Sequence, residues 1–119
     1  IMQRDFEKVG FPGLFEAGAS GSILKGETPY EGAVRELMEE TGIYTDDLTY
    51  VFTYSNLSHV FYFGYLCVTD CEKSSIVLQK GETISYRWVS RDEFLKFVET
   101  PEYVPTQRER WCSHWNRFL

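Results

Sequence analysis

The sequence is poor in the features that mark secreted, zinc-bound or membrane-spanning chains. It has three cysteines, Cys67, Cys71 and Cys112, an odd number without Cys-x-x-Cys spacing, which argues against a disulfide scaffold and against a zinc site. No apolar run approaches the roughly 18 residues that a membrane span needs, and no signal peptide is visible. We therefore expect a reduced, cytoplasmic setting and no membrane partner.

Basic residues are also scarce. Lys and Arg number 12 against 18 Asp and Glu, which gives a net charge of −6. Proteins that coat nucleic acid neutralise its phosphates with Lys and Arg, so we expect no nucleic-acid partner. The 119 residues are 43% hydrophobic and contain no repeat or linker, which suits one core and a single domain over residues 1–119.

The informative segment is residues 21–43, GSILKGETPYEGAVRELMEETGI. In a helix, Glu36, Glu39 and Glu40 fall within an arc of about 100° and share one patch. Like charges this close repel one another, which costs stability unless a cation or an arginine such as Arg35 compensates. Mg2+ takes oxygen ligands and binds through one or two carboxylates plus substrate phosphates. The patch therefore predicts a site for a hard divalent cation.

Local signals place this helix at residues 29–41. Thr28 and Glu31 form a capping box around Pro29, a residue favoured at the first helical position. Gly42 stands where a left-handed C-cap would end the helix. The loop of residues 16–27 that leads into the helix is rich in glycine, which lets backbone groups approach a ligand closely.

Taken together, these residues match a known signature. The stretch resembles the box of the Nudix hydrolase family: glycine, five residues, glutamate, seven residues, then arginine, glutamate, an aliphatic, any residue, two glutamates, any residue, glycine and an aliphatic. A chance match to a pattern of this length is rarer than about one in a million. The positions are filled without a gap by Gly21, Glu27, Arg35, Glu36, Leu37, Glu39, Glu40, Gly42 and Ile43.

The resemblance implies a reaction and a site. Family members use Mg2+ or Mn2+ to hydrolyse a nucleoside diphosphate derivative, with water attacking phosphorus. It implies that three glutamates of the helix bind metal or act as base, without showing which is the base. It also implies that an arginine orients a glutamate, that a loop glutamate holds the loop or binds outer-shell water, and that one backbone carbonyl adds a ligand. In this sequence those residues are Glu36, Glu39, Glu40, Arg35, Glu27 and Ser20 (backbone).

Three residues outside the box are weaker candidates. Glu82 lies in a turn where related enzymes often take a further metal ligand or base, although a turn glutamate is usually only solvated. His59 would contact a substrate phosphate or, by the commoner alternative, be a partly buried structural histidine. Arg4 would meet a phosphate or pair with an acidic neighbour, and the sequence leaves both open.

Two other functions compete with hydrolysis. Isopentenyl diphosphate isomerase shares the architecture, but it needs a cysteine and a His-Pro in the loop before the box, and residues 10–26 contain neither. A non-catalytic Nudix-fold nucleotide-binding or regulatory module is the alternative from a different class. Such modules commonly lose box glutamates, whereas this box has all of them. Substrate identity stays open, and so does a homodimer, because many relatives dimerise.

The rest of the chain predicts the fold class. We expect strands at residues 50–54, 59–68 and 84–89, the second central because it is apolar on both faces, and helices at residues 91–99 and 106–118. Together with the resemblance this predicts an α/β fold, a Nudix-type α/β/α sandwich on a mixed β-sheet. Residues 1–4 resemble the end of the family strand before the box, so we expect a domain that lacks some N-terminal family residues.

Overall fold

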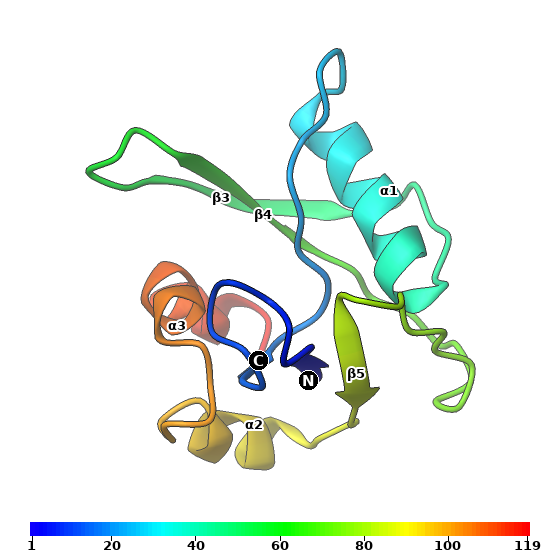
Figure 1. The fold of residues 1–119 in the computed structure, drawn as a ribbon, viewed down its shortest axis with the longest axis vertical. Helices are drawn as coiled ribbons and strands as arrows, with labels where there is room; N and C mark the ends of the chain where they lie inside the picture. Colours follow the sequence, from blue (N-terminus) through cyan, green and yellow to red (C-terminus); the bar gives the residue numbers. More distant parts are fainter. The chain divides into compact units, whose positions relative to one another are not determined.

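The computed structural model describes all residues, Ile1–Leu119. The chain forms two compact units, one made of Ile1–Ala19 with Leu78–Leu119 and the other of Ser20–Val77. The elements of both are drawn in Figure 1. The α/β class predicted from the sequence is confirmed.

The unit of Ser20–Val77 contains one helix and one hairpin. Helix α1 spans Pro29–Thr41, and antiparallel strands β3 (Thr49–Ser55) and β4 (Phe61–Leu66) form a two-stranded sheet. The predicted helix is confirmed to the residue: Thr28 and Glu31 make a complete capping box, and Gly42 ends the helix with a φ of 79°. Its N–H donates to the Met38 carbonyl at 2.9 Å.

Helix and hairpin meet through tyrosine rings. Tyr30 of α1 contacts Tyr65 of β4 edge to face, with ring centroids 5.7 Å apart, and Tyr65 in turn contacts Tyr50 of β3 at 6.0 Å. The Tyr30 hydroxyl donates to the Asp46 carbonyl and accepts from the Leu48 N–H. Since these contacts join the helix to the segment before β3, they hold the N-terminal end of α1 against the hairpin.

The expectation of a central strand at residues 59–68 is wrong. Strand β4 is shorter and pairs only with β3, and Phe61 and Phe63 are 62% and 37% exposed. The opposite face is filled from across the hairpin, because the Phe52 ring covers Gly64, where an added Cβ would lie 2.3 Å from a ring carbon. One face of β4 is therefore covered within the hairpin, while the other is partly exposed to solvent. An apolar sequence does not by itself make a strand central.

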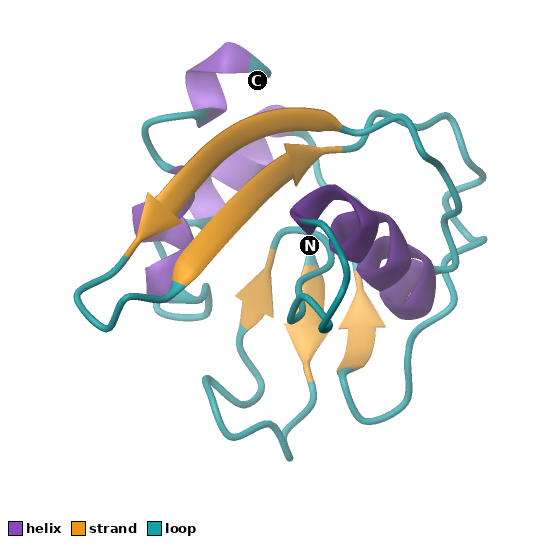
Figure 2. Cartoon of the chain, turned by 90° about the horizontal axis from the view of Figure 1, so that it is seen from above, coloured by secondary structure: helices purple, strands orange, loops and turns teal.

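The other unit contains an antiparallel sheet in the order β2-β1-β5, with β1 at Met2–Arg4, β2 at Phe15–Glu16 and β5 at Thr83–Tyr86. The three short strands lie side by side in Figure 2. The parallel component of the predicted mixed sheet is one bridge, between Phe15 and Tyr103.

Helices complete this unit. Helix α2 spans Arg91–Phe97 with Ser90 as its N-cap, and α3 spans Pro105–Trp111. A 3-10 turn, η1, covers Trp115–Arg117. The predicted helix at residues 106–118 is therefore too long. Chain reversal after α3 brings the Trp115 ring to 5.3 Å from Phe94. The core of this unit consists of Val98, Tyr103 and Trp115, packed with Phe94, Leu95, Phe97, Trp111 and Phe118.

None of the helices combines the length and the apolar composition needed to cross a bilayer.

Candidate active site

Arg35 is the centre of the Nudix-box contacts. Its Nε and Nη2 donate to the two carboxylate oxygens of Glu27 at 2.7 and 3.0 Å. Its Nη1 donates to Glu36 Oε1 at 2.8 Å and to Glu39 Oε2 at 3.0 Å. One guanidinium therefore joins the loop glutamate to two of the three carboxylates of the acidic patch. Lysine would not reproduce this planar, multiply bonded geometry.

The electrostatics follow from these contacts. Hydrogen bonding to Glu27, and then to Glu36, raises the pKa of the Arg35 guanidinium above its ordinary range. The same bond to Arg35, helped by the Leu24 N–H, lowers the pKa of the Glu27 carboxyl. Both groups are therefore charged at neutral pH, and the positive charge of Arg35 offsets repulsion within the acidic patch.

The third helix carboxylate faces the loop. Glu40 is 5% exposed, and its Oε2 accepts a hydrogen bond from the Ser20 N–H at 2.9 Å. A Cβ added at Gly21 would lie 2.1 Å from the Glu36 carboxyl carbon. A side chain at position 21 would therefore force the Glu36 carboxylate to shift, because the loop backbone passes directly over it. Both contacts bring the backbone of Ser20 and Gly21 to the acidic patch.

This donor set fits the metal that the resemblance implies. Carboxylates and a backbone carbonyl supply only oxygen, which Mg2+ and Mn2+ prefer, and the close approach at Gly21 leaves backbone and carboxylate in contact. In this structure no group of three His, Cys, Asp or Glu side chains encloses a metal position. Glu36 and Glu39 are turned onto Arg35, and Glu40 onto the Ser20 N–H. Metal binding would require these side chains to exchange partners.

The three candidates outside the box have other surroundings. Arg4 donates to Glu16 Oε1 at 3.2 Å and to the Gly10 carbonyl at 2.8 Å, so it does pair with an acidic neighbour. The expectation of a partly buried His59 is wrong: it is exposed in the hairpin turn, with a φ of 60°. Its role as a substrate ligand stays a prediction.

Glu82 lies in the turn before β5, as expected, and its carboxylate forms an ion pair with Lys8. Its carbonyl accepts from the Asp5 N–H at 3.0 Å. Glu82 belongs to the unit that contains β5, whereas the box lies in Ser20–Val77. A role for Glu82 as a metal ligand therefore stays a prediction.

One site contact was not predicted. The Ser22 carbonyl accepts from Arg35 Nη2 at 2.9 Å. No sequence signal could have revealed it, because any residue at position 22 supplies the same carbonyl. It adds a backbone anchor to the carboxylate contacts of the arginine.

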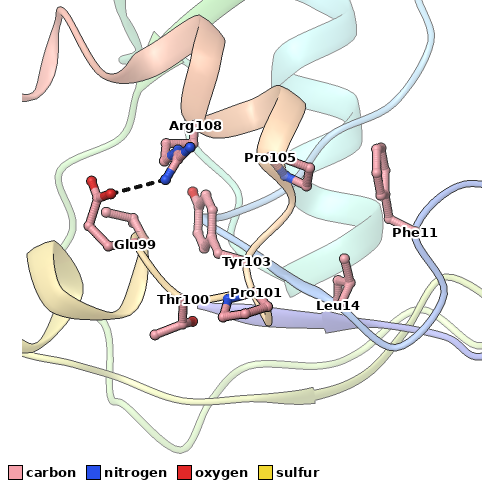
Figure 3. Close-up of a pocket in the computed structure, with 9 residues that line it drawn as sticks. Phe11, Leu14, Glu99, Thr100, Pro101, Tyr103, Pro105 and Arg108 are labelled. Carbon is pink, nitrogen blue, oxygen red and sulfur yellow. Dashed lines mark hydrogen bonds and ion pairs between the residues drawn. The ribbon is translucent and has the colours of Figure 1, made fainter.

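A separate cavity of about 330 Å³ lies in the unit that holds α2 and α3. Figure 3 shows its lining side chains and the ion pair between Arg108 and Glu99 at one side, 3.0 Å long. The walls are mainly apolar or aromatic and include no residue of the Nudix box. They are formed by Phe11, Leu14, Val98, Glu99, Thr100, Pro101, Tyr103, Pro105 and Arg108.

The site is a capped acidic helix that one arginine ties to a glycine-containing loop, within an α/β fold. This arrangement is typical of Nudix proteins. The family model of the NUDIX domain matches residues 1–111, and this chain belongs to the Nudix family. It is 33% identical over 109 residues to an uncharacterized Nudix hydrolase of Listeria monocytogenes serovar 1/2a, and equally to one of Listeria innocua serovar 6a. Each alignment covers 88% of this chain and 63% of the relative, so the chain spans less than two thirds of their length.

Proposed function

We propose that this chain hydrolyses a diphosphate linkage in a nucleoside diphosphate derivative, with Mg2+ or Mn2+ as cofactor. The observation that carries the proposal is the single network in which Arg35 holds Glu27, Glu36 and Glu39 beside the loop. Glu36, Glu39, Glu40 and the Ser20 carbonyl would hold the metal, and Glu82 is a further candidate ligand. When bound, the metal offsets developing charge and lowers the pKa of the attacking water.

The residues of this chain have separate tasks in that reaction. Arg35 keeps the carboxylates of Glu36 and Glu39 on one side of α1 and fixes the loop through Glu27 and the Ser22 carbonyl. Glu40 holds the Ser20 N–H, which orients the adjacent peptide groups. One carboxylate of the patch would accept the proton of the attacking water as general base. Arg4 and His59 are the proposed, still weaker, contacts to substrate phosphates.

A substrate panel tests this proposal. The protein is incubated with Mg2+ and a range of nucleoside diphosphate derivatives, and the release of phosphate or nucleotide products is measured. We expect turnover of at least one compound, and we expect Glu39→Gln or Glu40→Gln to reduce it by orders of magnitude because each removes a negative charge at nearly constant volume. Unchanged rates in both variants would place the chemistry elsewhere.

The same panel separates hydrolysis from the alternative function. A non-catalytic nucleotide-binding module would bind a compound of the panel, measured by calorimetry, without turning any of them over. The cytoplasmic location and the homodimer are likewise proposals. Sedimentation of the purified chain at several concentrations decides the second, since a dimer gives a concentration-dependent mass.

A further inference from the structure

A cavity of about 470 Å³ lies where the chain passes from β5 into α2, within the unit built from both ends of the chain. Figure 1 draws this passage as the yellow segment between the two elements. The cavity is lined by residues 87–89, by Glu93, Lys96 and Phe97 of α2, and by Thr100. Small-molecule sites have volumes of about 300–1,000 Å³. The size of this cavity therefore suits a small ligand, and no residue of the Nudix box contributes to it.

Two positive charges line this cavity without an acidic partner. Arg87 and Lys96 are both exposed, and the ion pairs of the structure join other residues. The lining contains one carboxylate, Glu93, whose Oε2 accepts from the Ser90 N–H at 2.9 Å as part of the capping box of α2. In a chain with a net charge of −6, two unpaired cations in one cavity are a local concentration of positive charge that favours an anionic ligand.

A packed aromatic ring supports Arg87. The guanidinium carbon lies 5.3 Å from the centroid of the Phe97 ring, which is a cation–π contact. The Phe97 ring is itself held edge to face by Phe15 at 5.4 Å and by Tyr103 at 6.2 Å. Arg87 forms hydrogen bonds only through its backbone, with Ile1. Its five guanidinium N–H donors are therefore left for a ligand.

The cavity also presents an indole ring beside these cations. Trp88 lines the cavity and is 45% exposed. Aromatic side chains bind nucleobases by stacking, and every base has a face that can stack. Arginine and lysine are the side chains that bind phosphate, arginine through its planar set of donors and lysine as a point charge. The lining of the cavity therefore matches the two parts of a nucleotide, a flat ring and a phosphate.

We propose that this cavity binds a nucleoside monophosphate, with the base on Trp88 and the phosphate on Arg87 and Lys96. A phosphate monoester carries close to two negative charges at neutral pH, which the two cations balance. A long nucleic acid fits less well, because a chain with a net charge of −6 repels a polyanion. The site needs no metal and is separate from the Nudix box, so it goes beyond the proposed hydrolysis.

The test follows the indole N–H signals of the full chain by NMR. Excess EDTA removes divalent metal, so that binding at the Nudix box through a metal does not contribute. The Trp88 signal is identified by its loss in Trp88→Leu. Adenosine monophosphate and uridine monophosphate are titrated to millimolar concentration, beside adenosine and inorganic phosphate. We expect both monophosphates to shift the Trp88 signal, each with a lower Kd than adenosine or inorganic phosphate, because only the monophosphates engage both the ring and the cations.

Charge variants locate the phosphate. Arg87→Gln and Lys96→Gln each remove one cation from the cavity, and we expect each to raise the Kd for a monophosphate about tenfold, as the loss of a charged hydrogen bond typically does. Lys80→Gln is the matched control, because it makes the same change in net charge at an exposed position of the same unit outside the cavity. Its Kd should equal that of the wild type. Should Arg87→Gln not fold, Lys96→Gln at an exposed position still tests the proposal.

Three results would overturn the nucleotide site. The first is a Trp88 signal that neither monophosphate shifts. The second is an unchanged Kd in Lys96→Gln, or a loss in Lys80→Gln as large as that in Lys96→Gln, which would reduce the effect to overall charge. The third is a Kd for inorganic phosphate as low as that for the monophosphates, which would leave a phosphate site without a base. None of these results bears on hydrolysis at the box, because no metal is present in the measurement.

Discussion

Gly21 and Glu36 show at the scale of single residues what a glycine at the first position of the box permits. Gly21 does not have a positive φ, so its backbone would accept alanine. A side chain would instead displace the Glu36 carboxylate, which an added Cβ would meet at 2.1–2.3 Å. The glycine is therefore explained by its neighbour on the helix and not by backbone conformation.

From this contact we predict that Gly21→Ala displaces the Glu36 carboxylate while the protein stays folded. Misplacing a reacting group by about 1 Å can cost about 100-fold in rate, so hydrolysis should fall by that order with little change in melting temperature. Lys25→Gln, at an exposed position of the same loop, is the control and should keep wild-type turnover. Wild-type activity in Gly21→Ala would mean that Glu36 is free to move without consequence.

The ion pair of Arg35 and Glu27 gives a pH prediction. The folded protein lowers the pKa of Glu27, so the stability that this carboxylate contributes is present above its unfolded pKa of about 4.3. It is lost as pH falls through the lower folded value. The melting temperature of the wild type should therefore exceed that of Glu27→Gln at pH 6, and the difference should shrink below about pH 4. A difference that stays constant down to pH 3 would contradict this assignment.

At the scale of elements, α1 was predictable because its limits are local. A capping box, a proline at the first position and a C-cap glycine all lie within the segment itself. The length of α3 was not, because residues 112–114 contain no breaker and the reversal depends on packing Trp115 against Phe94. The surroundings of β4 depend likewise on Phe52 covering Gly64 from the next strand.

At the site, too, local contacts are predictable from the sequence and long-range contacts are not. Contacts of Arg35 within the helix follow from spacing, since Glu36 and Glu39 lie next to it and four residues on. The pairing of Glu82 with Lys8 joins residues 74 positions apart. The hydrogen bond from the Ala17 N–H to the Gln107 amide joins residues 90 positions apart. No periodicity or motif encodes such pairs, so the sequence predicts the acidic patch but not these contacts.

The end of α1 carries a prediction of its own. Gly42 and Gly26 have similar positive φ angles, 79° and 87°, but only at Gly42 would a Cβ meet a neighbour, the Val77 side chain at 3.3 Å. Forcing alanine into this conformation costs about 1–2 kcal/mol. In urea unfolding, Gly26→Ala should lose about that much, and Gly42→Ala about 1 kcal/mol more because of crowding. Equal losses would show that Val77 moves aside freely.

At the scale of the whole molecule, the two compact units are not consecutive halves of the sequence. One unit is assembled from both ends, Ile1–Ala19 and Leu78–Leu119, and the other, Ser20–Val77, is inserted between them. All the proposed metal ligands except Glu82 lie in the inserted unit. Metal binding is therefore expected to act unequally on the two units.

We predict that Mg2+ slows amide exchange mainly in Ser20–Val77, above all around α1 and the loop before it. A ligand stabilises only the states in which its site is assembled, by about 2.7 kcal/mol at 100 times its dissociation constant, and local opening of α1 dismantles the site. Exchange followed by mass spectrometry measures this, with Glu40→Gln as the control that loses the effect. Slowing confined to α2 and α3 would contradict a site on α1, whereas equal slowing in both units would mean that the metal stabilises them as one.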